Sequence, residues 1–151
     1  MAALRTYWYT WAKCNHTMMR DLDQQTDAGE NWQLAASYSR AEALRHGVLA
    51  DVSDTAREAG FSCPVAVTSA VWLDVVVPTE LDRAHGQSAE GRLWDILWVL
   101  RHRACRTSAS EVLFDVLVIR GGQQVTVPLR AVIEPGDTGE PVITVMLTAE
   151  D

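Results

Sequence analysis

The chain has 151 residues, a length typical of one domain, and its 48% hydrophobic content can supply a single core. Its 9 glycines and 5 prolines, with 22% charged residues, exclude a collagen-like, coiled-coil or wholly disordered chain. With 13 basic and 20 acidic residues the net charge is −7, which argues against unaided binding to nucleic-acid phosphates because such binding requires clustered Lys and Arg.

The N-terminal segment MAALRTYWYTWAKCNH contains no apolar run long enough for a signal peptide, because Arg5 and Lys13 interrupt it. The chain also lacks an apolar stretch long enough to span a membrane. Its three cysteines, Cys14, Cys63 and Cys105, are widely spaced and form no C-x-x-C pair. We therefore expect a cytoplasmic protein with reduced thiols and no membrane contact.

The N-terminal part has an aromatic segment followed by a polar one. In YWYTW (7–11) the residues alternate with a period of two, which predicts a short aromatic strand or arm. Residues 21–31 (DLDQQTDAGEN) are polar and predict a loop. The chain is thus divided into residues 1–31, an N-terminal arm or strand with its polar loop, and residues 32–151, the main domain.

The period becomes helical from Trp32, and capping signals then predict about four helices. Ser39 and Glu42 form a capping box, and Gly47 and Gly60 stand where helices end. The predicted helices lie within 39–47, 53–60, 68–77 and 88–104. The third is rich in β-branched residues and is also compatible with a strand. Residues 79–91 predict a polar connection.

Helix 88–104 carries the strongest helical pattern in the chain. Its apolar stripe consists of Leu93, Ile96, Leu97 and Leu100. Trp94 and Trp98 lie four residues apart on the flank of that stripe. We expect both of them, together with Trp72, to face the core, where each indole would bury on the order of 200 Å².

After Ser110 the period becomes two, which predicts strands. EVLFDVLVIR (111–120) and VTVPLRAVIE (125–134) read as a hairpin joined at Gly121–Gly122. A second turn, PGDTGEP, leads to a third strand in 142–148. The expected fold is α+β, with helices first and a three-stranded antiparallel meander last.

No common catalytic motif occurs in the chain, and we expect neither a metal nor a cofactor. Cys14 and His16 have no matching pair of metal ligands. His85, with Asp82 or Asp95, is the one candidate for a general base beside a carboxylate. The plainer interpretation places such carboxylates on solvated faces of the fold.

The negative charge is concentrated near the C-terminus. From Thr107 onward there are seven acidic and two basic residues, a net charge of −5, and none is basic after Arg130. We take this segment as the candidate partner-binding surface, together with two tryptophans outside the main periodic region. The candidate residues are Glu134, Asp137, Glu140, Glu150, Asp151, Trp8 and Trp11.

Three segments of the sequence resemble a family of uncharacterised proteins encoded on bacterial plasmids and phages. They are GVLADVSDTAREAGFSCPVAVTSAVW (47–72), GRLWDILW (91–98) and PGDTGEPVITVML (135–147). Genes of that family often lie near anti-restriction genes. The resemblance implies a role in protecting or maintaining a mobile element, and it transfers no catalytic residue.

The leading hypothesis is a non-enzymatic counter-defence protein of the anti-CRISPR or anti-restriction type. Its acidic surface would bind a basic surface of a host defence protein, without direct contact to nucleic acid. One alternative is a small cytoplasmic enzyme that uses the His85–carboxylate pair. Another is an oligomeric plasmid-maintenance protein, a homodimer for example, with Trp8 and Trp11 at the contact.

Overall fold

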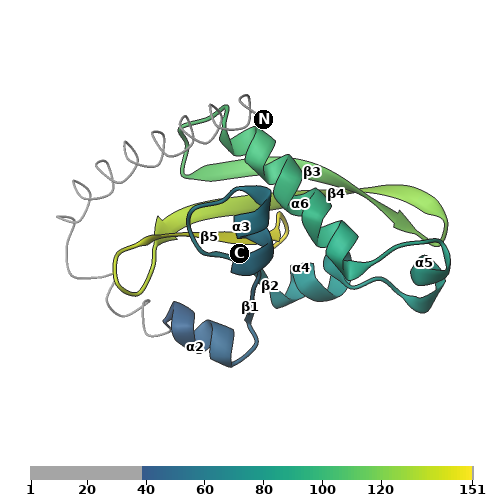
Figure 1. The fold of residues 1–151 in the computed structure, drawn as a ribbon, viewed down its shortest axis with the longest axis horizontal. Helices are drawn as coiled ribbons and strands as arrows, with labels where there is room; N and C mark the ends of the chain where they lie inside the picture. Colours follow the sequence, from purple (N-terminus) through teal and green to yellow (C-terminus); the bar gives the residue numbers. More distant parts are fainter. Residues whose placement is uncertain (1–38, 151) are drawn as a thin grey trace.

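The computed structural model describes residues 39–150, in which five strands form one mixed sheet (Figure 1). The order across the sheet is β1-β2-β5-β4-β3. All neighbouring strands are antiparallel except β2 and β5, which run parallel. The strands are β1 (Leu49–Asp51), β2 (Val65–Thr68), β3 (Glu111–Arg120), β4 (Gln123–Pro135) and β5 (Pro141–Leu147).

The predicted C-terminal meander forms only part of this sheet. β3 pairs with β4 and β4 with β5, both antiparallel and in chain order, as expected. However, β2 adds to β5 and β1 adds to β2, so the meander is extended by strands from the first half of the domain. β1 and β2 are only three and four residues long, too short to show a period of two.

α2 and α6 begin directly after the predicted capping serines, Ser39 and Ser88. In α3 the predicted cap Ser53 is instead the first helical residue, and the N-cap Val52 makes no side-chain hydrogen bond. Ser39 and Glu42 form the capping box of α2, and Gly60 ends α3 with a φ of 103°, a left-handed conformation that suits glycine. The polar connection 79–91 contains an unexpected short helix, α5, which a Thr79–Asp82 capping box starts. The helices named here are α2 (Arg40–Arg45), α3 (Ser53–Ala59), α5 (Glu80–Ala84) and α6 (Ala89–Ala104).

The ambiguous segment 68–77 is helical but not a regular α-helix. Thr68 caps a single turn, α4 (Ser69–Val71), which continues as the π-helix η1 (Trp72–Val76). The Val77 amide donates to the Trp72 carbonyl at 2.9 Å, the i to i+5 bond of that widened turn. The helix ends at Val76, two residues before Pro78, which cannot donate a backbone hydrogen bond.

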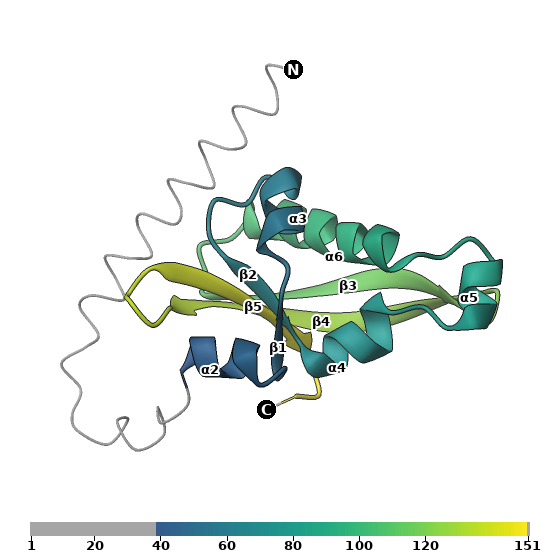
Figure 2. The same cartoon turned by 60° about the horizontal axis from the view of Figure 1, so that its bottom comes forward.

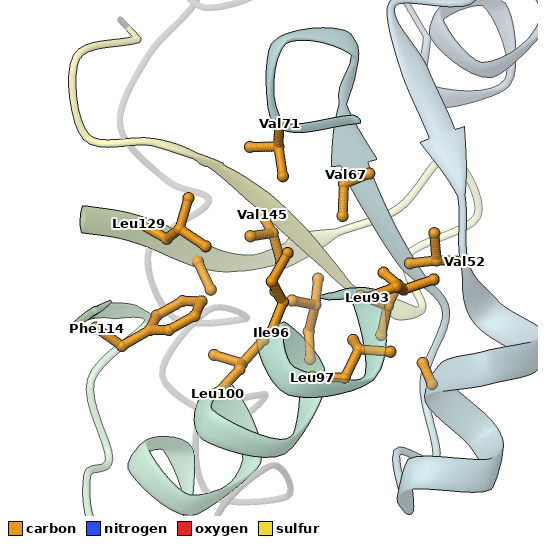
Figure 3. Close-up of a cluster of buried hydrophobic side chains, with 14 of the residues drawn as sticks. Val52, Val67, Val71, Leu93, Ile96, Leu97, Leu100, Phe114, Leu129 and Val145 are labelled. Atoms are coloured by element: carbon orange, nitrogen blue, oxygen red, sulfur yellow. The ribbon is translucent and has the colours of Figure 1, made fainter. Parts of the chain in front are cut away.

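α3 and α6 cover one face of the sheet, as Figure 2 shows. The apolar stripe of α6 lies on the inward-facing residues of the strands, and small Ala56 and Ala59 let α3 approach α6 closely. Figure 3 shows the centre of this core. Its labelled members are Val52, Val67, Val71, Leu93, Ile96, Leu97, Leu100, Phe114, Leu129 and Val145.

The opposite face of the sheet is covered only in part. α2 lies against it, and the Arg40 guanidinium donates to the Thr144 Oγ1 and to the Ile143 carbonyl. On β3, Leu113 and Leu117 point to this face and remain 64% and 55% exposed. Within residues 39–150, no helix combines the length and apolar character needed to cross a membrane.

The N-terminal predictions cannot be compared with this structure. The aromatic arm, the polar loop and the boundary at residue 31 all lie outside the described residues, and so do Trp8, Trp11 and Asp151.

Candidate functional site: an acidic edge beside the β4–β5 turn

Three of the predicted acidic residues lie together at one end of the sheet. Glu134 is near the end of β4, and Asp137 and Glu140 belong to the turn that leads into β5. The turn is closed by hydrogen bonds from the Gly136 amide to the Glu140 carbonyl and from the Gly139 amide to the Gly136 carbonyl. Glu134, Asp137 and Glu140 are therefore fixed on a tight connection between two paired strands.

Asp137 joins this turn to the start of α2. Its two carboxylate oxygens accept hydrogen bonds from the Arg40 and Ala41 amides, each at 2.9 Å. These amides are at the first turn of the helix, where N–H groups have no partner within the helix and a negative charge is favourable. Asp137 thus has a structural role beside any binding role.

Arg40 lies close to Glu134 and Asp137 but not to Glu140. Burial lowers the pKa of its guanidinium, while the carboxylates of Glu134, Asp51 and Asp137 act in the opposite direction. Asp51, on β1, is an acidic residue that we did not anticipate here. We call Asp51, Glu134, Asp137 and Glu140 the acidic edge. Its four carboxylates exceed the one guanidinium of Arg40 by three charges.

Glu140 stays ionised well below neutral pH. The Thr138 hydroxyl and the Thr138 amide both donate to its Oε2, and the hydroxyl contact is the main cause of a lowered carboxyl pKa. The acidic edge therefore keeps the Glu140 charge under physiological conditions.

Glu150 lies away from the acidic edge, beyond the other end of β5. Its Oε2 accepts hydrogen bonds from the Thr68 hydroxyl and from the Leu147 amide, both at 2.8 Å. This carboxylate connects the end of β5 to the end of β2. The structure thus brings together Glu134, Asp137 and Glu140 but not Glu150.

The His85 candidate is not arranged as a general-base pair with Asp82. The His85 Nδ1 contacts the Leu81 carbonyl at 2.8 Å, at the end of α5. Asp82 is 2% exposed and directs its carboxylate to Arg92 at 3.1 Å, to the Gly121 amide at 2.8 Å and to the amide of Thr79. The Gly121 hydrogen bond is the largest cause that lowers the pKa of Asp82, to about 2.

Arg92 extends this contact into a buried network that sequence reasoning missed. It is 3% exposed and also donates to the carbonyls of Val75 and Ile119, and so it links α6 to η1 and β3. The sequence contains one indication that Arg92 could be buried, because Arg92 immediately precedes Leu93 of the apolar stripe. Periodicity alone assigns a charged residue at such a position to the surface.

The expectation that Trp94 and Trp98 face the core is wrong. They are 37% and 40% exposed, because each follows an inward-facing leucine and is turned about 100° from it around the helix. Trp98 contacts His102 edge to face, with ring centroids 4.9 Å apart, and the Arg101 guanidinium lies 5.9 Å from the Trp98 ring centroid. Trp72 is half-buried and packs against the core, as expected.

Cys63 is buried, and burial raises the pKa of its thiol to about 11, which makes it a poor nucleophile. It lines a cavity of about 340 Å³ with Phe61 and Arg57. A larger cavity of about 610 Å³ lies between α3 and the start of α6. Among the described residues, no group of three or more His, Cys, Asp or Glu side chains is placed to hold a metal ion.

Comparison with known proteins assigns the chain to a family. A family described as a family of unknown function, DUF6573, matches residues 28–151. No match was found among curated proteins or among solved structures.

Proposed function

Since the chain belongs to the DUF6573 family, whose description leaves its function open, we propose a function from the chain's own surface: it is a binding protein whose acidic edge engages a basic surface of another protein. The observation that carries this proposal is the acidic edge, in which Glu134, Asp51 and Asp137 act on Arg40 and Asp137 caps α2, while Glu140 lies beside Asp137. Preformed charges of one sign accelerate association with an oppositely charged surface and favour the correct partner.

The partner class that we propose is a host defence protein that binds nucleic acid. Such a protein presents clustered Lys and Arg to phosphates, and a negatively charged protein surface can occupy the same cluster. This proposal takes its biological setting from the resemblance to an uncharacterised family encoded on plasmids and phages, whose genes often lie near anti-restriction genes. We propose that the chain acts there as an anti-CRISPR or anti-restriction protein. It requires no catalytic residue in this chain.

Glu134→Lys is the sharpest test of the acidic edge. Glu134 is exposed on β4, and no side-chain hydrogen bond or ion pair of the described residues involves it. Its charge nevertheless acts on Arg40, so circular dichroism and urea unfolding must show that the variant is folded before its activity is compared. Asp115→Lys is the matched control, because Asp115 is also an exposed strand residue and the change of charge is the same.

The assay measures how many phages form plaques, or how much unmodified plasmid transforms, in hosts that carry a restriction or CRISPR system. We expect the unaltered chain and Asp115→Lys to raise this efficiency and Glu134→Lys to lose most of the effect. With a partner so identified, affinity should fall as salt increases, because exposed charges are screened. Equal activity of both variants would show that the acidic edge is not the contact surface.

A further inference from the structure

We propose that the cavity between α3 and α6 is a receptor for an arginine side chain of a protein partner. This proposal rests on the proposed function only for the identity of the partner. The cavity itself lies on a separate part of the surface. It is lined by residues of α3, η1 and α6, and α3 and α6 cover one face of the sheet, away from the acidic edge (Figure 2).

The cavity has aromatic walls and acidic side chains. It measures about 610 Å³, which is large enough for a side chain of a partner. Trp72, at the junction of α4 and η1, and Trp94 of α6 contribute the aromatic surface. Glu58 of α3 and Glu90 of α6 contribute the carboxylates. The remaining lining residues are Thr55, Ala89, Gly91 and Leu93.

The local sequence explains how these side chains converge. Thr55 and Glu58 are three residues apart and share one side of α3, next to the buried Ala56 and Ala59 that pack toward α6. Glu90 and Trp94 are four residues apart and share one side of α6. The close packing of the two helices therefore sets Glu58 and Glu90 around one cavity.

The charge of the cavity is not compensated within the described residues. Neither Glu58 nor Glu90 takes part in an ion pair there, and no basic residue lines the cavity. Glu90 is in the first turn of α6, where the helix dipole favours a negative charge. Glu58 is next to the last residue of α3, where the dipole disfavours it. Glu58 therefore costs the helix stability, and a bound cation would offset that cost.

These features select a cation, and arginine in particular. An anion would be attracted by the N-terminus of α6 but repelled by both glutamates. A planar guanidinium can stack on an indole and still donate to carboxylates, whereas the ammonium of lysine is a compact point charge. One turn further along α6, Arg101 already lies over Trp98 at 5.9 Å from the ring centroid. Trp94 presents the same kind of surface to the cavity.

The test is a titration of the full chain with an arginine-rich hexapeptide, followed by NMR of the tryptophan indole N–H signals. Trp72→Phe and Trp94→Phe assign the two signals of the cavity. The control peptide carries citrulline in place of arginine, which keeps the shape of the side chain and removes its charge. Well-dispersed amide spectra confirm that each variant is folded.

We expect saturable shifts of the Trp72 and Trp94 signals with the arginine peptide and at least about tenfold weaker binding of the citrulline peptide. Glu58→Gln combined with Glu90→Gln should weaken arginine binding by a similar factor, and Glu134→Gln should leave the Trp72 and Trp94 shifts unchanged. Equal binding of the two peptides, or unchanged binding by the double variant, would overturn the proposal, as would shifts confined to other tryptophans.

The outcomes separate this proposal from the proposed function. Arginine binding at Trp72 and Trp94 without any counter-defence activity would keep the receptor and remove the proposed function. Counter-defence activity that depends on Glu134, with no arginine binding at the cavity, would keep the proposed function and remove the receptor.

Discussion

Replacing Arg92 with methionine tests whether the buried Asp82–Arg92 network holds α5, α6, η1 and the β3–β4 turn together. Methionine keeps much of the aliphatic volume of arginine but donates no hydrogen bond. The variant leaves the Asp82 carboxylate buried without its cation, and the carbonyls of Val75 and Ile119 lose a donor. The Gly121 and Thr79 amides continue to donate to Asp82.

Breaking a buried ion pair by removing one partner costs about 3–5 kcal/mol, because the remaining charge is no longer compensated. A domain of this size has a free energy of unfolding of about 5–15 kcal/mol, so Arg92→Met should remove a large share of it. Adding Asp82→Asn removes the uncompensated charge and keeps an oxygen for the Gly121 amide. The double variant should therefore regain at least about 1 kcal/mol relative to Arg92→Met alone.

Urea unfolding followed by circular dichroism at pH 7 measures these differences. The reasoning is refuted if Arg92→Met costs less than about 1 kcal/mol, or if adding Asp82→Asn destabilises it further. Acid titration gives an independent check. The pKa of Asp82 is lowered from 3.8 to about 2, so its contribution is complete above pH 3.8 and is lost as pH falls toward 2. That loss should be smaller in Arg92→Met.

Three further predictions concern single features of the fold. Asp137→Ala should cost about 1 kcal/mol, measured by urea unfolding, because two amides of α2 lose their acceptor; an unchanged midpoint would contradict this. Because the pKa of the buried Cys63 thiol is raised to about 11, iodoacetamide at pH 8 should label Cys63 far more slowly than the partly exposed Cys105. Mass spectrometry measures both labelling rates, and equal rates would contradict the prediction. Leu113→Gln and Leu117→Gln should each change stability by less than about 0.5 kcal/mol in urea, since both side chains are mostly exposed; a larger loss would mean that this face is covered.

The features that the sequence predicted well depend on local patterns. The hairpin of β3 and β4 pairs Glu111 with Val132 through Arg120 with Gln123, as the period of two and Gly121–Gly122 indicate. The capping signals at Ser39 and Gly60 also mark true helix ends. Such signals require only neighbours along the chain, and so one sequence is sufficient to find them.

The missed features depend on contacts between distant segments. β2 joins the sheet by parallel pairing with β5, which is more than seventy residues later in the chain. Asp82 meets Arg92 only because α5 folds back on the start of α6. Asp51 joins the acidic edge only because the pairing of β1 with β2 and of β2 with β5 sets it level with Thr144, to which Arg40 donates. Trp94 was missed for a different reason. A residue at the border of a helix's apolar stripe can face either the core or the solvent, and periodicity does not decide which.

The structure also shows that the acidic residues differ in how much of their negative charge is available to a binding partner. A carboxylate that accepts backbone amides, as Asp137 does at α2 and Glu150 does at Leu147, has part of its field cancelled by those N–H dipoles. A partner therefore gains less from it than from a carboxylate with no such bond. Among the described residues, Glu134, Glu58 and Glu90 have neither a side-chain hydrogen bond nor an ion pair. Charge reversal at these three positions should therefore affect binding to a basic partner more than reversal at Asp137 or Glu150, whose main effect should be on stability.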